Sequence, residues 1–451
     1  MIKTTILKAI IIVYAMSAMN QLLYAQENGQ QLFIEDAVKT AQENDPWIEG
    51  NQHTQDATNS MSVAAGSLPD PQVSLSLANL PSDSFSFNQD GMTQLRIGVS
   101  QMFPQGRSLS IKRRQLELQA GAFPHQRDDR IAKVAVTVSH LWLDAYKAQR
   151  SIALIEENRS LFEQLTDIAM SSYSSAMGKT RQQDIIRAQL ELTRLNDRVT
   201  MLEQAKETFI ETLSEWLNIE SAGNTPFKVA DYLPNQAVSH PEFVGKDMIV
   251  RDEDLYDALS QHPMMKALEQ NIEATKAGVD LAKQKYKPEW GINAAYGRRN
   301  SDPFGNSRSD ALTVGVSFSV PLFTANRQDK EYSAAISKRE AIKTEKWQLL
   351  RKLKAGFETS KAQLLRLNDR KALFENDLLP QMSEQAEASL TAYTNDDGDF
   401  AEVVRARIAE LNAKIDALNI DVERQKTITQ LNYYFTSSEM IQEDEYAGEA
   451  Q

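Results

Sequence analysis

The densest group of side chains that could bind an ion is the acidic turn Asn395-Asp-Asp-Gly-Asp399. Carboxylate and amide oxygens are the ligands of calcium loops, which hold them at fixed alternate positions and close on a distal glutamate. The turn has neither that spacing nor that glutamate. Its simplest interpretation is a solvated acidic turn with a glycine at a helix end.

Other residues of catalytic type form no recognisable site. The sequence has no cysteine, and therefore no thiol nucleophile, thiolate metal site, disulfide or lipid anchor. It has no glycine-rich phosphate loop, no His-Glu-x-x-His and no Gly-x-Ser-x-Gly. We expect no enzyme activity, no cofactor and no metal site. The five histidines are scattered without an i,i+4 pair: His53, His125, His140, His240 and His262.

The formal charge of -13 on 451 residues argues against a nucleic-acid partner. At the N-terminus, Lys3 and Lys8 precede a mostly apolar run that is too short to cross a membrane as a helix. Residues 1–25 are therefore predicted to be a signal peptide, and the protein to be exported. No later segment approaches the roughly 18 uncharged apolar residues that a membrane helix needs.

Four segments alternate between apolar residues and small or polar ones, which is typical of strands with one apolar and one wet face. We expect strands at about 72–80, 94–104, 289–297 and 311–322. Such strands reach the roughly 9–11 residues of a bilayer-spanning strand and favour an outer-membrane barrel. A soluble sandwich that buries one face is the alternative. The wet face would carry Gly98, Ser100, Asn293, Gly315 and Ser317.

Several prolines, a glycine and a serine recur at an interval of 217 residues, which indicates an internal duplication. We expect a first repeat at 26–222, an equatorial linker at 223–250, a second repeat at 251–436 and an acidic tail at 437–451. The matching residues are Pro46 and Pro263, Pro71 and Pro288, Gly98 and Gly315, Ser100 and Ser317, and Pro104 and Pro321.

A long helical stretch follows each strand pair, at 108–173 and 325–393, and each would reach about 90–100 Å. Leu350, Phe357 and Leu364 fall seven residues apart, as in the seam of a coiled coil. Pro380 is expected to bend its helix locally.

Each long helix ends in a turn and is followed by a return helix. The turns run from Tyr173 to Gly178 and from Tyr393 to Gly398. Gly178 and Gly398 are expected to take the left-handed conformation that closes a helix end.

Four strands cannot enclose a lumen, and an open sheet edge in lipid leaves backbone groups unpaired at several kcal/mol each. Several copies must therefore share one barrel. Three copies would supply twelve strands, an even number of workable diameter. The sequence alone gives no direct count of copies. The helices would continue the tube into the periplasm.

The run from Gly315 to Phe323 and the turn pattern Tyr…Gly…Val-Val-Arg-Ala resemble the TolC-type outer membrane efflux proteins, over nearly all of the mature chain. This resemblance implies a mainly α fold with membrane β: a homotrimer with a twelve-stranded barrel in the outer membrane of a Gram-negative bacterium and a twelve-helix periplasmic tunnel. It also implies a periplasmic adaptor (a membrane fusion protein) and an inner-membrane RND-type pump.

A narrower resemblance lies in one hairpin, in Leu68-Pro-Asp-Pro, Asn79-Leu-Pro and Gly98-Val-Ser-Gln-Met-Phe-Pro. These short segments are similar to those of the heavy-metal branch of the family, the CusC- and CzcC-like channels. The similarity implies heavy-metal cations as cargo. The chain departs from some members of the family in having no cysteine for a lipid anchor.

The resemblance also assigns the two turns. Family members constrict at the periplasmic tip with acids just after the second turn, where Glu402 stands, while Arg405 occupies a position where another acid can occur. Three copies of these acids around an axis would form a negative ring that favours cations. The constriction would include Asp396, Asp397, Asp399 and Glu402, and the contacts with the adaptor would include Tyr173, Gly178, Tyr393 and Gly398.

Three alternatives remain beside the efflux duct. A type I protein-secretion channel would have the same architecture. A poreless coiled-coil protein of the envelope explains the helices but not the strands. A periplasmic enzyme is the remotest option.

Overall fold

The computed structural model describes residues 31–174, 182–218, 227–245, 251–395 and 398–437. The predicted signal peptide, and all but the first residue of the predicted acidic tail, lie outside these ranges. The chain divides into two compact units. The helical unit comprises Met1–Pro46, Asp128–His262 and Lys352–Gln451, and the strand unit comprises Trp47–Arg127 and Pro263–Arg351.

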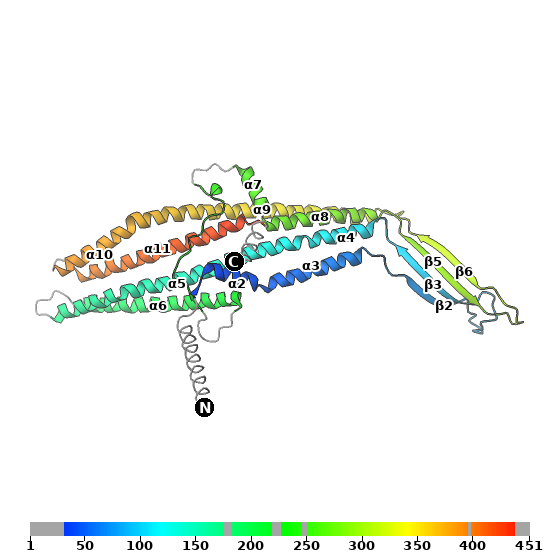
Figure 1. The fold of residues 1–451 in the computed structure, drawn as a ribbon, viewed down its shortest axis with the longest axis horizontal. Coiled ribbons are helices and arrows are strands. Elements are labelled where there is room, and N and C mark those ends of the chain that lie inside the picture. Colours follow the sequence, from blue (N-terminus) through cyan, green and yellow to red (C-terminus); the bar gives the residue numbers. More distant parts are fainter. Residues whose placement is uncertain (1–30, 175–181, 219–226, 246–250, 396–397, 438–451) are drawn as a thin grey trace, which may run out of the picture. The chain divides into compact units, whose positions relative to one another are not determined.

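The strand unit holds one antiparallel sheet with the strand order β2-β3-β5-β6 (Figure 1). Its strands are β2 (Gln72–Ala78), β3 (Gln94–Phe103), β5 (Trp290–Arg299) and β6 (Ala311–Phe318). The period-2 alternation of the sequence is what makes these segments strands.

The fourth strand ends at Phe318, earlier than the expected residue 322. Its partner strand β5 begins at Trp290, so the ladder finishes with the amide of Ser319, which donates to the carbonyl of Glu289 at 3.0 Å. Pro321 beyond it has no N–H to donate. The later alternating residues are therefore unpaired within this sheet.

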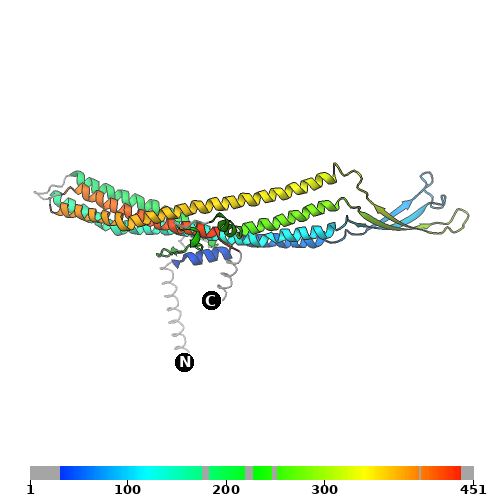
Figure 2. The same ribbon diagram turned by 90° about the horizontal axis from the view of Figure 1, so that it is seen from above.

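Helices of the strand unit include α3 (Pro46–Ala65), α4 (Ser108–Ala120), α8 (Pro263–Gln284) and the first part of α9 (Gln328–Leu373). In both views α4 lies beside α8 (Figures 1 and 2). The helices α3 and α8 both begin at a proline, and these prolines are the pair that the 217-residue interval relates.

The helical unit contains α2 (Ile34–Glu43), most of α5 (Ala122–Ser174), α6 (Gln182–Leu217), α7 (Asp252–Ser260), the rest of α9, α10 (Leu379–Thr394) and α11 (Phe400–Tyr434). Two short strands, β1 (Gln31–Leu32) and β4 (Lys228–Val229), pair in parallel, and a 3-10 turn spans Pro241–Phe243. The helices α10 and α11 lie side by side (Figure 2).

Two apolar clusters hold the helical unit together. The first packs α2, α5 and α6 around Trp142, whose indole N–H donates to the carbonyl of Leu32 at 2.9 Å. The second packs α5, α6 and α11 around Phe162 and Phe400. None of the described helices combines the length and the apolar composition needed to cross a membrane.

The two long helical stretches are interrupted. Gly121 separates α4 from α5, whereas Pro124 lies in the first turn of α5, where its missing N–H costs no helical bond. Before Pro380 the helix widens into a π-helical turn, Phe374–Leu378, and Pro380 then falls in the first turn of α10. The irregularity expected at Pro380 is therefore accommodated in the residues that precede it.

Three residues of the seam predicted in α9 are buried, together with two residues between them. Leu350, Phe357 and Leu364 are all buried, and so are Leu353 and Ser360 between them. Alternating steps of three and four residues relate these five positions, which is the spacing of a seam packed against neighbouring helices.

Candidate functional site

The four-stranded sheet sorts its side chains by polarity. On one face Ser100 of β3 lies opposite Asn293 of β5, which lies opposite Gly315 of β6. Gly98 occupies the neighbouring row, between Ser74 and Ala295. We call this the polar face. The five residues expected on the wet side of the strands all lie on it, since Ser317 pairs with Gly291 two positions further along.

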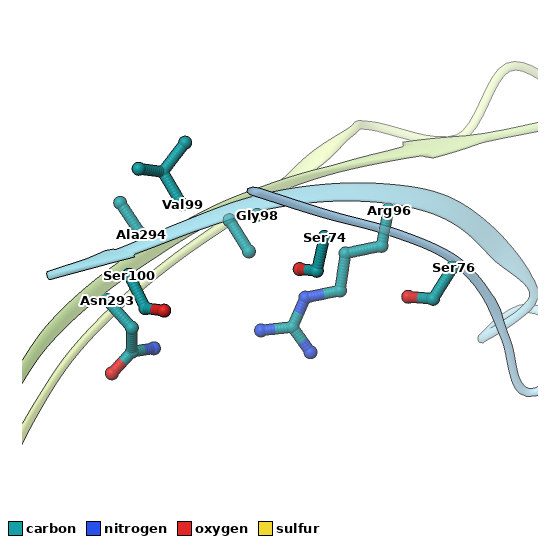
Figure 3. A pocket seen from close by; sticks show the side chains of 9 residues that line it. Ser74, Ser76, Arg96, Gly98, Val99, Ser100, Asn293 and Ala294 are labelled. Carbon is teal, nitrogen blue, oxygen red and sulfur yellow. The ribbon is translucent and has the colours of Figure 1, made fainter. Parts of the chain in front are cut away.

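Figure 3 shows Ser74, Ser76, Arg96, Ser100 and Asn293 projecting to one side of the sheet, and Val99 and Ala294 to the other. The first group lines a shallow pocket together with Gly98. Hydroxyl, amide and guanidinium groups thus gather on one side of the sheet.

The glycines of the polar face allow its polar side chains to lie close to the backbone. A Cβ atom added at Gly98 would stand 2.8 Å from the hydroxyl of Ser74, and one at Gly315 would stand 2.8 Å from the amide oxygen of Asn293. A side chain at either position would therefore require its cross-strand neighbour to move.

The opposite, apolar face is exposed. Leu75, Ile97 and Val314 are 73 %, 50 % and 67 % exposed, and none of the described elements covers them. A soluble sandwich would bury this face in its core, and no second sheet packs on it among the described residues. Water disfavours a continuous aliphatic surface of this kind, which is typical of a surface that meets another apolar phase or partner. The exposed aliphatic residues are Val73, Leu75, Leu77, Leu95, Ile97, Val99, Ile292, Leu312, Val314 and Val316.

In the helical unit, the turn between α10 and α11 is held by an aromatic contact. The rings of Tyr393 and Phe400 meet edge to face at 5.5 Å, and Phe400 is 2 % exposed. Asp399 caps α11, because its carboxylate accepts from the amide of Ala401 at 3.1 Å. Glu402 pairs with Arg405 at 3.0 Å on the exposed helix surface. Neither the helix cap by Asp399 nor the ion pair of Glu402 was predicted from the sequence.

Gly398 is not left-handed, which corrects the expectation for this turn. Its requirement for glycine is steric instead: an added Cβ would stand 2.6 Å from the backbone nitrogen of Tyr393. Asp396, Asp397 and Gly178 lie outside the described residues. Tyr173 is 53 % exposed near the end of α5.

A buried polar cluster was missed by the sequence prediction. Asp129 accepts from the hydroxyl of Tyr433 at 2.9 Å and from Lys133 at 2.6 Å. The buried His262 stands 4.0 Å from the same carboxylate and stacks edge to face on Tyr433 at 5.0 Å. Asp129 and Tyr433 are 304 positions apart, so no local pattern could have joined them.

Burial lowers the pKa of His262 from 6.5 to about 4, against the smaller opposing effect of Asp129. The unfolded chain binds this proton below about pH 6.5, while the folded protein resists it until about pH 4. The free energy of unfolding should therefore fall by about 3 kcal/mol as the pH drops through this window. Denaturant unfolding at pH 7 and pH 4 measures this difference. His262→Gln should reduce the pH dependence, and an unchanged slope in that variant would contradict the assignment.

Comparison with known proteins gives a match to a family profile over part of the chain and a similar fold over nearly all of it. Residues 255–434 match the sequence profile of the outer membrane efflux protein family. No curated protein matches the chain.

Three solved structures illustrate the fold. The outer-membrane channel OprN matches with a TM-score of 0.72 and 13% identity, over 90% of both chains. CusC matches with a TM-score of 0.72 and 14% identity, over 90% of this chain and 92% of its own. The outer membrane protein VceC of Vibrio cholerae matches with a TM-score of 0.73 and 11% identity, over 90% and 96%.

The chain therefore has the fold of outer-membrane channel proteins, and its second half carries the profile of the efflux family. The predicted resemblance to that family is confirmed to this extent. OprN and VceC match as well as CusC does, so the heavy-metal branch stays a prediction.

Proposed function

We propose that the protein is the outer-membrane exit duct of a tripartite efflux system, passing small cargo passively from an inner-membrane pump and a periplasmic adaptor to the outside. One observation carries the proposal: a four-stranded sheet exposes a continuous apolar face on one side and has a polar face on the other. A membrane barrel places the apolar face against lipid and the polar face against water, so each face meets a medium of matching polarity. The family profile of residues 255–434 supports the same function.

The two edge strands, β2 and β6, require other copies of the chain. Within the sheet, each of these strands pairs on one side only. In lipid the unpaired backbone groups would cost several kcal/mol each, so a closed barrel is needed. We propose a homotrimer whose twelve strands close the barrel, and in which the five wet-face residues named above line the lumen. The long helices would form a tunnel in the periplasm.

We also propose that the tip of the helical hairpins restricts flow in the resting trimer. The acids Asp396, Asp397, Asp399 and Glu402 would gather around the axis. Replacing them by Asn, Asn, Asn and Gln should raise the single-channel conductance and weaken any cation preference at the tip. Asparagine also caps helices well, so α11 should keep its N-terminus in this variant. Unchanged conductance and selectivity would refute the gate.

The turns near Tyr173, Gly178, Tyr393 and Gly398 would meet the adaptor. Gly398→Val is predicted to abolish efflux while trimers still assemble, because the new side chain displaces the backbone of Tyr393 at the contact. Drug or metal sensitivity of cells measures efflux, and gel mobility without heating measures assembly. Gly50→Val, where nothing lies within 4 Å of an added Cβ, is the matched control. Full efflux by the Gly398 variant would rule out a role for this turn in docking.

Planar-bilayer recording tests the duct itself. Purified protein should insert in discrete conductance steps, whereas a poreless scaffold would give none. Heavy-metal cations are the cargo implied by the sequence resemblance. A deletion strain tested against metals and drugs would identify the cargo class, and secretion of a protein substrate would favour a type I secretion channel instead.

A further inference from the structure

The polar face of the sheet carries charge of one sign. Along its alternate positions in the four described strands, the ionisable side chains are Arg96 on β3 and Arg299 on β5. No aspartate or glutamate occupies this face within those strands. This differs from the net charge of the whole chain, which is -13.

Arg96 is placed among small residues. It lies opposite Ser76 on one side and Gly297 on the other, and Gly297 is followed in the same row by Ala311. Figure 3 shows its side chain extending on the same side of the sheet as Ser74 and Ser76. With no bulky neighbour in its row, the guanidinium can reach solvent over the polar face.

The carboxylates that directly precede β5 and β6 in the chain are used elsewhere or stand far away. Arg96 forms no ion pair with any described residue. Asp310 accepts hydrogen bonds from the hydroxyl of Tyr296, on the apolar face, and from the amide of Arg299. Glu289 lies eight residues along β5 from the row of Arg96, about 26 Å away. That distance exceeds three Debye lengths of about 8 Å at physiological ionic strength.

We propose that Arg96 determines the charge preference of the duct, and that its cargo is anionic: small molecules that carry carboxylate or phosphate groups. The inference rests on the proposed function. In a closed trimer three copies of Arg96 would form a positive ring within the lumen. Guanidinium pairs with carboxylate and phosphate in a fixed two-pronged geometry, and rings of arginine or lysine favour anions in pores.

The proposed anionic cargo differs from the heavy-metal cations that the sequence resemblance implied. A positive ring repels bare metal cations, so heavy-metal export through it would be disfavoured. At the other end of the chain, the two described acids of the turn are already engaged: Asp399 caps α11 and Glu402 pairs with Arg405. Their charge is thus partly neutralised, whereas that of Arg96 is not.

The reversal potential of reconstituted channels in a potassium chloride gradient tests the proposal. The wild-type protein should prefer chloride. Arg96→Gln should shift the reversal potential toward the cation-selective side, and Arg96→Lys should keep the wild-type value. Arg298→Gln is the matched control, because it removes the same charge from an exposed position on the opposite face, beside Leu95.

The rate at which an introduced cysteine is modified tests the same charge while Arg96 is kept. This measurement remains possible if the Arg96→Gln variant does not assemble. The chain has no cysteine, so Ser74→Cys introduces a single thiol in the row next to Arg96. An anionic methanethiosulfonate should modify it faster than a cationic one of similar size.

The outcomes separate the two proposals. Absence of any channel conductance would refute the proposed function. Conductance with a cation preference in the wild type, an unchanged reversal potential in Arg96→Gln, or faster modification by the cationic reagent would overturn the role of Arg96 while the duct stands.

Discussion

Ile97→Lys is expected to prevent the protein from assembling in the outer membrane. Ile97 is 50 % exposed in the middle of the apolar face, between Leu75 of β2 and Tyr296 of β5. A lysine facing lipid near the bilayer midplane costs about 2–4 kcal/mol per copy. Three copies in one barrel would lose about 6–12 kcal/mol by the same measure, which is comparable to the whole stability of a typical domain.

Ser100→Lys is the matched control, since it adds the same charge to the polar face of the same strand. It should assemble normally, because the ammonium group would be hydrated in the lumen. Immunoblots of outer-membrane fractions, run with and without heating, report both insertion and the intact oligomer. Equal assembly of the two variants would mean that the apolar face does not meet lipid.

The second large effect is expected from Trp142→Ala in the helical unit. Trp142 is 1 % exposed, stacks on Tyr146 with ring centroids 5.6 Å apart, and donates to the carbonyl of Leu32. Truncating a buried aromatic residue costs about 3–5 kcal/mol, and here the carbonyl also loses its donor. The cluster around Trp142 joins α2 to α5 and α6, so α2 should become sensitive to protease.

Trp142→Phe separates the two contributions. It keeps most of the packing but removes the indole N–H, so its loss should be about 1–2 kcal/mol. Denaturant unfolding of both variants, followed by limited proteolysis, measures the effects. A loss of less than about 1 kcal/mol in Trp142→Ala would show that this cluster does not stabilise the unit as described.

Short-range periodicity explains what could be predicted from the sequence. The faces of the strands follow from alternation alone, because one residue separates the two sides of a sheet. Leu350, Phe357 and Leu364 were predicted in the same way, from a seven-residue repeat, and all three are buried. Patterns that repeat every two or seven residues can be recognised in the sequence without any knowledge of distant contacts.

Features that depend on contacts across the chain could not be predicted. The pairing of Asp129 with Tyr433 joins segments that have no common motif. The conformation of Gly398 depends on how closely α11 returns to Tyr393, which the turn sequence does not specify. The pairing of β3 with β5, which places Ser100 beside Asn293, joins the two halves of the chain, and only the structure gives its register.

We propose that identical copies share one barrel, because four strands per chain are too few to close around water. Within one chain β2 and β6 are separated by β3 and β5, which puts them about 14 Å apart. A disulfide needs Cα atoms about 4.4–6.8 Å apart. Cysteines on these two strands can therefore cross-link only between chains, and the native chain has no cysteine to interfere.

The most direct measurement is oxidative cross-linking of Ser74→Cys on β2 combined, one pair at a time, with Thr313→Cys, Gly315→Cys or Ser317→Cys on β6. At least one pair should give covalent dimers and trimers under denaturing conditions, with no larger species, while single-cysteine variants should stay monomeric. Monomers from every pair, or a ladder that continues beyond three chains, would contradict the shared twelve-stranded barrel.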